Sequence, residues 1–407
     1  MARSSERDSA PVGTGDNIPH HRTRDDTGDA SNTDSTGTAR TIGNAGSAAS
    51  ASCTAHSTAQ HAPLADILMR AWMQRGPLAC LLWPLSLLFG LLASARRAAY
   101  RFGLFRQQRL PVPVIVVGNL FIGGTGKTPL TIWLVESLRR AGHRPGVISR
   151  GYGGDAAGVR EVLTASSAGA IGDEPVLIAR RTGCPLVVGR DRVAAGRALL
   201  AAHPDITVVI ADDGLQHYRL ARDIEIVLSD ARGAGNGWLL PAGPLREPLS
   251  RRRDFSVENV GTPAAGSTSP PASGDRIHAM QLRATVVEQL CDRSQRMTLA
   301  SLAARKPVPT ILAAAGIGNP ARFFTTLAAA GLVFDRLSLP DHHAFSTQTF
   351  AAHTAECILI TEKDAVKCGD IDGLAQDQRI WVVPVDAVLA ASFTEKILEK
   401  LRGFPTA

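Results

Sequence analysis

The stretch that most constrains the fold is "VPVIVVGNLFIGGTGKTPL", residues 112–130. Its apolar start predicts a buried strand over 112–119, and residues 128–141 predict a helix that Gly142 ends. The glycines between them allow a tight loop whose backbone amides face one anion, and the positive end of the following helix adds to the attraction. A chain with this order of elements is expected to build a phosphate-binding site at the edge of a parallel sheet.

The loop departs from the common phosphate-loop pattern, because Phe121 occupies the position where that pattern has its first glycine. We interpret it as a variant loop whose useful amides begin at Gly123, rather than as a glycine-rich turn with a surface lysine. Lys127 is expected to reach the outer phosphates and Thr128 to bind Mg²⁺. The predicted nucleotide-binding residues are Gly123, Gly124, Thr125, Gly126, Lys127 and Thr128.

Short apolar strands alternate with helices along the rest of the chain, which predicts an α/β protein with parallel sheets covered on both faces. We expect a sheet domain that contains the phosphate loop, a second and smaller α/β domain, and an N-terminal membrane helix. The predicted strands are 112–119, 145–151, 185–189, 206–213, 224–230, 308–319, 331–340, 357–364 and 380–386. The expected divisions are a disordered head (1–62), a membrane helix (77–95), a phosphate-loop domain (110–255), a linker or long loop (256–285) and a second domain (286–407).

The run from residue 77 to residue 95 contains no charged side chain and is close to the length that crosses a bilayer as a helix. Arginines flank it, and the larger excess follows it, which favours a cytoplasmic position for the domains that come next. A buried core helix is the alternative interpretation, and a half-inserted helix stays open beside a spanning one.

Composition excludes some other classes of protein. Residues 1–60 contain no Leu, Phe, Tyr or Trp, so this head is expected to be disordered. The formal net charge of +7 suits an anionic ligand or membrane face, but only 5% of residues are aromatic and no basic and aromatic residues alternate. We therefore expect no nucleic acid partner. The six cysteines form no CxxC pair, which speaks against a zinc knuckle or a disulfide scaffold.

Two carboxylates, Asp212 and Asp213, end the apolar stretch "ITVVIADD". The carboxyl end of a parallel strand is where a residue that orders Mg²⁺ is expected. Adjacent side chains of a strand point to opposite faces, so we expect the pair to lie on the turn that Gly214 follows. A plain Asp-Asp-Gly turn is the alternative.

Three further stretches carry polar residues that either chemistry or local structure explains. In "GDEP", Asp173 is either a helix N-cap or a base near the phosphates. In "LPDHHAF", the Asp-His-His cluster contains a candidate base or a residue that orients one, more readily than part of a zinc site, and a structural loop histidine stays open. In "LPAGPLREP", Arg246 either binds a phosphate or forms a loop salt bridge with a carboxylate.

With these stretches in view, the chain resembles the tetraacyldisaccharide 4'-kinases of lipid A synthesis in Gram-negative bacteria. The matching stretches occur in order over roughly residues 77–390: "VGNLFIGGTGKTP", "ISRGYGG", "GDEP", "DDGLQH", "LPAGPLREP", "AGIGNP", "PDHHAF" and "TEKDAVK". The resemblance implies an enzyme of the inner membrane with its active site on the cytoplasmic side. It implies ATP and Mg²⁺ as cofactors, transfer of the γ-phosphate to the 4'-hydroxyl of a lipid A disaccharide precursor, and no obligate protein partner.

The resemblance also implies roles for residues at the matching positions. Asp173 matches the base that accepts the sugar hydroxyl proton, and His342 matches its partner. The matching acids that organise metal or substrate are Asp212, Asp213 and Glu247. The matching polar residues that line the site are His217, Arg246 and, as a weaker match, Arg192.

Two other functions remain compatible with the residues. A membrane-bound phosphate-loop ATPase that switches conformation has a similar loop, but such proteins often carry a lysine early in it, where this chain has Ile122. A soluble small-molecule kinase with a buried apolar helix is the third interpretation. Activity without a membrane after deletion of residues 77–95 distinguishes it from the lipid kinase.

Overall fold

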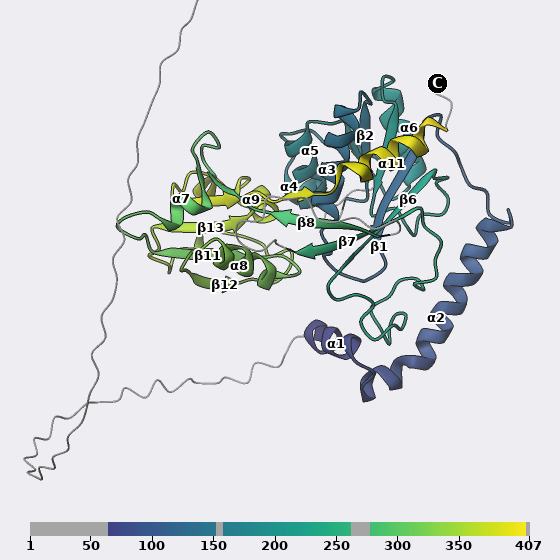
Figure 1. Ribbon diagram of the computed structural model, residues 1–407, viewed down its shortest axis with the longest axis horizontal. Coiled ribbons are helices and arrows are strands. Elements are labelled where there is room, and N and C mark those ends of the chain that lie inside the picture. The colour runs from purple at the N-terminus through teal and green to yellow at the C-terminus, as the bar shows by residue number, and fades with distance from the viewer. Residues whose placement is uncertain (1–63, 152–157, 262–276, 404–407) are drawn as a thin grey trace, which may run out of the picture. The chain divides into compact units, whose positions relative to one another are not determined.

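The computed structural model describes residues 64–151, 158–261 and 277–403, which form helices around two separate β-sheets (Figure 1). The predicted head, residues 1–62, lies outside the described residues. Both sheets are mostly parallel, with helices in the connections between their strands. This confirms the predicted α/β class with two sheets.

The larger sheet has the strand order β15-β8-β7-β6-β1-β5-β2-β4-β3. Its strands are β1 (Val114–Asn119), β2 (Pro145–Ser149), β3 (Arg160–Glu161), β4 (Leu186–Val188), β5 (Val208–Asp212), β6 (Ile224–Asp230), β7 (Phe255–Gly261), β8 (Ile277–Arg283) and β15 (Asp386–Val388). The edge strands β3 and β15 are antiparallel to their neighbours, and the other strands pair in parallel. Every residue of β1, β2 and β5 is buried, as expected for strands covered on both faces.

Side chains that alternate along β1 enter two different cores. Ile115 and Val117 pack with α3 (Lys127–Arg140), α5 (Asp173–Thr182) and α11 (Ala391–Arg402) on one face. Val114 and Val116 pack with α6 (Arg192–Ala202) and the loops after β5 on the other face. The phosphate loop therefore leaves a strand that is held rigidly from both sides.

The smaller sheet has the strand order β10-β9-β14-β13-β11-β12. Its strands are β9 (Val286–Gln289), β10 (Arg296–Thr298), β11 (Ile311–Ala315), β12 (Asp335–Ser338), β13 (Cys357–Thr361) and β14 (Ile380–Val383). The four strands β14, β13, β11 and β12 are parallel to one another, and β9 runs antiparallel to both of its neighbours, β14 and β10. The remaining helices are α1 (Leu64–Met73), α2 (Pro77–Arg101), α4 (Ala168–Ile171), α7 (Leu299–Ala303), α8 (Pro320–Ala329), α9 (Glu362–Cys368), α10 (Asp372–Ala375) and the 3₁₀ turn Thr347–Thr349.

The sheets divide the chain differently from the expected domain boundaries. The expected linker, 256–285, contributes β7 and β8 to the larger sheet, although its residues 262–276 lie outside the described part. The C-terminal β15 and α11 also return to the larger sheet, where Phe393 is buried and stacks on Trp133 at 5.7 Å between ring centroids. Local patterns missed this because β7 and β8 are half-buried, and because a strand's sheet depends on distant partners.

Helix α2 is the part of the described chain that is long and apolar enough to cross a membrane. Only 11% of its most apolar window is buried, which argues against a core helix of a soluble protein. Small residues form its inner face: Ala79 and Ser86 are buried, and Ser86 donates a hydrogen bond to the carbonyl oxygen of Leu239 at 2.6 Å. Large leucines cover the other faces and are exposed, for example Leu81 at 76% and Leu92 at 62%.

Candidate active site

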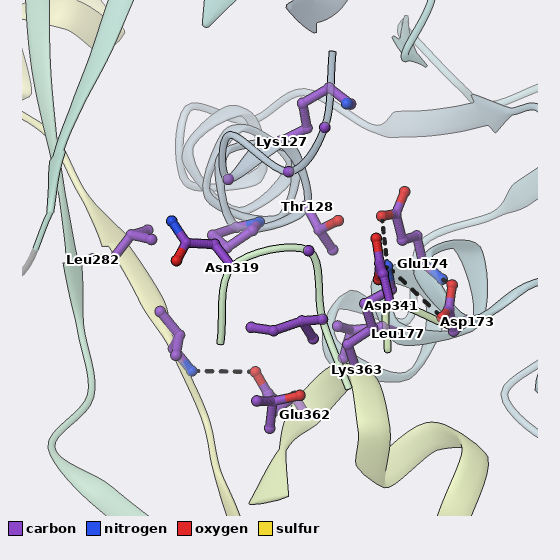
Figure 2. A pocket seen from close by; sticks show the side chains of 18 of the residues that line it. Lys127, Thr128, Asp173, Glu174, Leu177, Leu282, Asn319, Asp341, Glu362 and Lys363 are labelled. Atoms are coloured by element: carbon purple, nitrogen blue, oxygen red, sulfur yellow. Dashed lines mark hydrogen bonds and ion pairs between the residues drawn. The ribbon is translucent and has the colours of Figure 1, made fainter. Parts of the chain in front are cut away.

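A cavity of about 620 Å³ lies where the carboxyl ends of parallel strands from both sheets meet. The larger sheet contributes the phosphate loop after β1 and the segments after β2 and β5, and the smaller sheet contributes the segments after β11, β12, β13 and β14. Loops at the carboxyl ends of parallel strands are the usual place for ligands in α/β proteins. The charged and polar lining residues include Lys127, Thr128, Arg150, Asp173, Glu174, Asp212, Asp213, Arg246, Asn319, Arg322, Asp341, His342, Glu362 and Lys363. Figure 2 labels eight of these: Lys127, Thr128, Asp173, Glu174, Asn319, Asp341, Glu362 and Lys363.

The phosphate loop has a shape that only glycine tolerates at its last bend. Gly126 precedes α3 with a φ of 100°, and a Cβ atom there would lie 2.8 Å from Nδ2 of Asn259. The same Asn259 amide donates to the carbonyl oxygen of Thr125 at 2.9 Å and so holds the loop from strand β7, which β6 separates from β1 in the sheet. Gly123, Gly124 and Gly126 line the cavity, whereas Thr125 is buried and is not among the lining residues.

Lys127 lies at the start of α3 and contacts two oxygen atoms of the larger sheet. Its Nζ donates to Oδ1 of Asn119 at 3.1 Å and lies 3.7 Å from Oδ1 of Asp213. The Nδ2 group of Asn119 donates to the carbonyl oxygens of Phe121 and Gly123 at 2.5 and 3.0 Å. Asn119 therefore shapes the loop and positions its lysine. The polar residue at the end of a fully apolar strand was the sequence signal for it.

Asp212 and Asp213 lie side by side in the chain but in different environments. Asp212 ends β5, is buried, and accepts hydrogen bonds from the hydroxyls of Thr131 and Ser149 at 3.1 and 3.3 Å. Burial raises the pKa of Asp212 to about 6, and the charge of Glu174 adds to the rise. A carboxylate in such a place favours a nearby cation.

Asp213 follows the strand with a φ of 50°, so a left-handed bend turns its side chain toward the cavity. Arg246 contacts its carboxylate at 3.2 Å from the other side of the cavity edge. Burial acts to raise the pKa of Asp213, but the charges of Lys127 and Arg246 outweigh it and hold that pKa below its usual value. Of the two open interpretations of Arg246, the structure shows the salt bridge, at a position that also lines the cavity.

Asp173 and His342 meet in the cavity, although 169 residues separate them in the sequence. Nδ1 of His342 lies 3.1 Å from Oδ2 of Asp173. Asp173 is the first residue of α5, and Gly172 occupies the N-cap position with no side-chain cap. The other oxygen, Oδ1, accepts the backbone N–H of Glu174 at 2.9 Å. The N-cap interpretation of Asp173 therefore does not hold, and its carboxylate is oriented toward the imidazole.

Lys363 is a site residue for which sequence reasoning offered only the stretch "TEKD" as a candidate. It comes from the first turn of α9, and its Nζ lies 3.3 Å from Glu174, 3.4 Å from Asp341 and 3.8 Å from Asp173 (Figure 2). Burial acts to lower the pKa of Lys363, but the three carboxylates outweigh it and raise that pKa. Lys363 thus stays charged and ties α5 of the larger sheet to the smaller sheet.

Besides Thr125, three predicted site residues lie outside the cavity lining. Glu247, expected to organise metal or substrate, is buried and accepts hydrogen bonds from Tyr218 and Arg251, both at 2.5 Å. A carboxylate that is already paired with an arginine and accepts a hydrogen bond from a phenol is a poor metal ligand, so the structure does not bring Glu247 to the metal-binding side. Its neighbour Arg97, at 3.5 Å, connects it instead to α2.

Arg192 and His217 lie close to Asp212 and Asp213 but outside the cavity lining. Arg192 is buried and donates to the backbone carbonyls of Gly189 and Asp212 at 2.5 and 3.4 Å, which supports the end of β5. Burial lowers the pKa of His217 to about 4, and the charges of Arg192 and Arg150 lower it further, so its imidazole is neutral at physiological pH. Neither residue lines the cavity.

Within the described part of the chain, no three His, Cys, Asp or Glu side chains form a metal cluster. Asp212, Asp213 and the hydroxyl of Thr128 nevertheless share the cavity with the phosphate loop. One or two carboxylates combined with a hydroxyl and nucleotide phosphates are a donor set that suits Mg²⁺. The residues therefore fit a magnesium ion that a nucleotide brings with it, and not a protein cage for a metal alone.

Comparison with known proteins gives a consistent result. The sequence profile described as tetraacyldisaccharide-1-P 4'-kinase matches residues 78–402. The chain is 60% identical over 346 residues to a tetraacyldisaccharide 4'-kinase of Janthinobacterium sp. (strain Marseille), covering 84% of this chain and 98% of the relative. It is 56% identical over 353 residues to the enzyme of that name from Herminiimonas arsenicoxydans, covering 86% and 99%.

A solved structure agrees with this relationship. The crystal structure of LpxK from Aquifex aeolicus in complex with ATP matches with a TM-score of 0.66 and 29% sequence identity. The match covers 80% of this chain and 99% of the Aquifex chain. A profile match over most of the chain, near-complete coverage of the relatives and the shared fold lead to one conclusion: this chain belongs to the tetraacyldisaccharide-1-P 4'-kinase family.

Proposed function

We propose that this chain transfers the γ-phosphoryl group of ATP to the 4'-hydroxyl of tetraacyldisaccharide 1-phosphate in lipid A biosynthesis. The observation that carries the proposal is the Asp173–His342 pair, which lines the same cavity as the phosphate loop. A nucleotide site alone fits many enzymes and switches. A paired carboxylate and imidazole beside it supply a base for an alcohol acceptor.

The phosphate loop and its neighbours bind and align the nucleotide. The amides of Gly123, Gly124 and Gly126 and the N-terminus of α3 face the phosphates, and Lys127 exchanges its contact with Asp213 for a phosphate oxygen. Thr128, Asp212 and Asp213 would hold the Mg²⁺ of the nucleotide, and that ion would neutralise charge on the phosphates. Arg192 supports the backbone of Asp212, and Arg246 orients Asp213.

Asp173 accepts the proton of the sugar hydroxyl as the phosphoryl group transfers. Its Oδ2 atom is free of backbone contacts and faces His342, while the N–H of Glu174 restrains Oδ1. His342 orients the carboxylate and stabilises the charge that changes during proton transfer. The positive charge of Lys363 offsets part of the negative charge of the carboxylates of Asp173, Glu174 and Asp341.

The lipid acceptor accounts for helix α2. Its exposed leucines fit the hydrocarbon of the inner membrane, and the arginines after it fit an anionic headgroup layer on the cytoplasmic side. Its small inner-face residues and the Arg97–Glu247 contact hold it against the loops that follow β5 and β6. We therefore expect the active site to act near the membrane surface at which the acceptor is presented.

A label-transfer assay tests the proposal. ATP labelled at its γ-phosphate is mixed with tetraacyldisaccharide 1-phosphate in detergent micelles, together with the full chain. We expect label in the lipid with the wild-type chain and with a His343→Ala control, but a strong decrease with His342→Ala. ATP hydrolysis without labelled lipid would contradict the proposal and favour a membrane-bound ATPase that acts as a switch.

A further inference from the structure

The departure of the phosphate loop from the common pattern has a structural counterpart at Phe121. The ring of Phe121 is buried and packs under the guanidinium group of Arg232, whose Cζ lies 4.4 Å from the ring centroid. The same guanidinium donates to the carbonyl oxygen of Gly124 in the phosphate loop at 2.9 Å. The aromatic ring of Phe121 therefore stabilises the guanidinium group of Arg232 through a cation–π contact. A glycine at position 121 would remove this contact.

Asp230, the last residue of β6, fixes this arginine from the other side. Its buried carboxylate accepts from Nε and Nη2 of Arg232 at 3.0 and 2.8 Å. With the carboxylate, the ring and the loop carbonyl, Arg232 has three contacts that hold its guanidinium in place. Such an arginine is part of the framework of the loop and is not available to move toward a ligand.

Arg322 makes a single contact with the same carboxylate. It lies in the first turn of α8, attached to the smaller sheet, and its Nη2 is 3.3 Å from Oδ2 of Asp230. Its side chain is 23% exposed and lines the cavity. Two guanidinium groups thus face one carboxylate, which leaves net positive charge beside the phosphate loop.

The backbone near Arg322 also approaches the loop. A Cβ atom on Gly318, in the segment between β11 and α8, would lie 3.7 Å from the backbone nitrogen of Gly124. The start of α8 is therefore adjacent to the amides that face the phosphates. Two independent contacts, one through Asp230 and one through Gly318, place Arg322 at the phosphate end of the cavity.

We propose that Arg322 binds the outer phosphates of ATP, and that it does so by exchanging its contact with Asp230 for phosphate oxygens. The smaller sheet then contributes its own cation to the nucleotide, so that ATP ties the two sheets together through its β- and γ-phosphates. Arg232 keeps Asp230 neutralised after the exchange, which makes the movement of Arg322 inexpensive. This inference rests on the proposed nucleotide site.

Nucleotide titrations on the full chain test the inference without the lipid reaction. Arg322→Gln is compared with the wild type for Mg²⁺ complexes of an ATP analogue with a methylene bridge between the β- and γ-phosphates, and for AMP. We expect at least a tenfold loss of affinity for the analogue and no change for AMP, because AMP lacks the outer phosphates. Arg322→Lys should recover part of the loss, and Arg305→Gln, at an exposed residue that does not line the cavity, should show none.

A second variant separates phosphate binding from a structural ion pair. Asp230→Asn releases Arg322 while Phe121 and Gly124 still hold Arg232, so we expect unchanged or tighter binding of the analogue. Equal losses for the analogue and AMP, no loss in Arg322→Gln, or the same loss in Asp230→Asn would each overturn the inference. A wild-type chain that binds the analogue but labels no lipid contradicts the proposed function and leaves the inference standing.

Discussion

The carboxylate of Asp173 is buried, yet it is surrounded by an imidazole, a backbone N–H and the ammonium group of Lys363. In the proposed function, these neighbours orient the carboxylate to accept a proton from the sugar hydroxyl. An amide of the same shape keeps most of the contacts but accepts no proton. Replacing the carboxylate with an amide therefore tests proton acceptance separately from the structural role of Asp173.

We expect Asp173→Asn to lower turnover by about 10²–10⁴-fold, the usual contribution of general base catalysis. Nucleotide affinity should stay within a few-fold of the wild type, because Asp173 is attached to α5 and not to the phosphate loop. Initial rates of label transfer and nucleotide titrations measure both quantities. Asp335→Asn, on the exposed strand β12, serves as the control. Near-normal turnover in Asp173→Asn would reduce this residue to a structural role.

His217 predicts a pH dependence of stability. Its folded pKa of about 4 lies below the value of roughly 6.5 for an unfolded histidine. The unfolded chain therefore takes up a proton between these values that the folded chain does not, and stability present above pH 6.5 is lost as the pH falls toward 4. We expect the imidazole signal of His217 in NMR spectra not to shift between pH 8 and pH 5. A midpoint near 6.5 would show that the burial is incomplete.

At the scale of elements, the junction of β1, the phosphate loop and α3 depends on one backbone conformation. Gly126 takes a left-handed φ, and the adjacent strand β7 leaves no room for a side chain because Asn259 lies against it. Gly142, after α3, has a φ of 88° with open space around its Cβ position. The two glycines therefore differ in packing but share the backbone requirement.

Gly126→Ala is expected to lower the free energy of unfolding by more than Gly142→Ala. The left-handed conformation alone costs about 1–2 kcal/mol for a residue with a side chain, and it applies to both variants. Only Gly126→Ala also displaces Asn259 and its hydrogen bond to the loop, so only this variant should lose nucleotide binding. Urea denaturation and nucleotide titration measure the two effects. Equal stability and intact binding in both variants would contradict the account of the loop.

At the scale of the whole described chain, helix α2 is long and apolar enough to cross a membrane, and we propose it as the membrane anchor of the body that contains the cavity. Its inner face consists of small residues that pack on the loop around Leu239, and its outer faces carry large exposed leucines. Because the two faces are separate, substitutions can change membrane contact without changing how the helix packs on the rest of the protein, and the reverse.

Leu88→Glu combined with Leu92→Glu is expected to move the protein from the membrane fraction to the soluble fraction. Each charge costs about 2.5–3.5 kcal/mol in the centre of a membrane helix, and both positions are more than half exposed in the structure. Fractionation of cells measures the distribution. The Ser86→Ala control removes the hydrogen bond to Leu239 and should stay with the membrane, with stability lowered by about 1 kcal/mol. Continued membrane association of the double variant would contradict the anchor.

The local sequence predicted the phosphate loop, the strands around it, the apolar helix and the start of α5. Each of these depends on hydrophobic periodicity, on the positions of glycines or on residues close by in the sequence. Motif resemblance added His342 and the family. The sheet membership of β7, β8, β15 and α11 could not be derived in this way, because strand partners far apart in the sequence decide it.

The tertiary structure also decided which charged residues reach the cavity. Glu247 is one residue from Arg246, yet Arg251 and Tyr218 neutralise it behind the site while Arg246 lines the cavity. Asp173, Lys363 and His342 come from separate segments, and their distances depend on how the two sheets meet. Residue types and spacing determined by themselves that this chain binds a phosphate beside an apolar anchor. Which charged side chains face that phosphate was decided only by the tertiary structure, because the burial and ion pairing of each side chain depend on residues far away in the sequence.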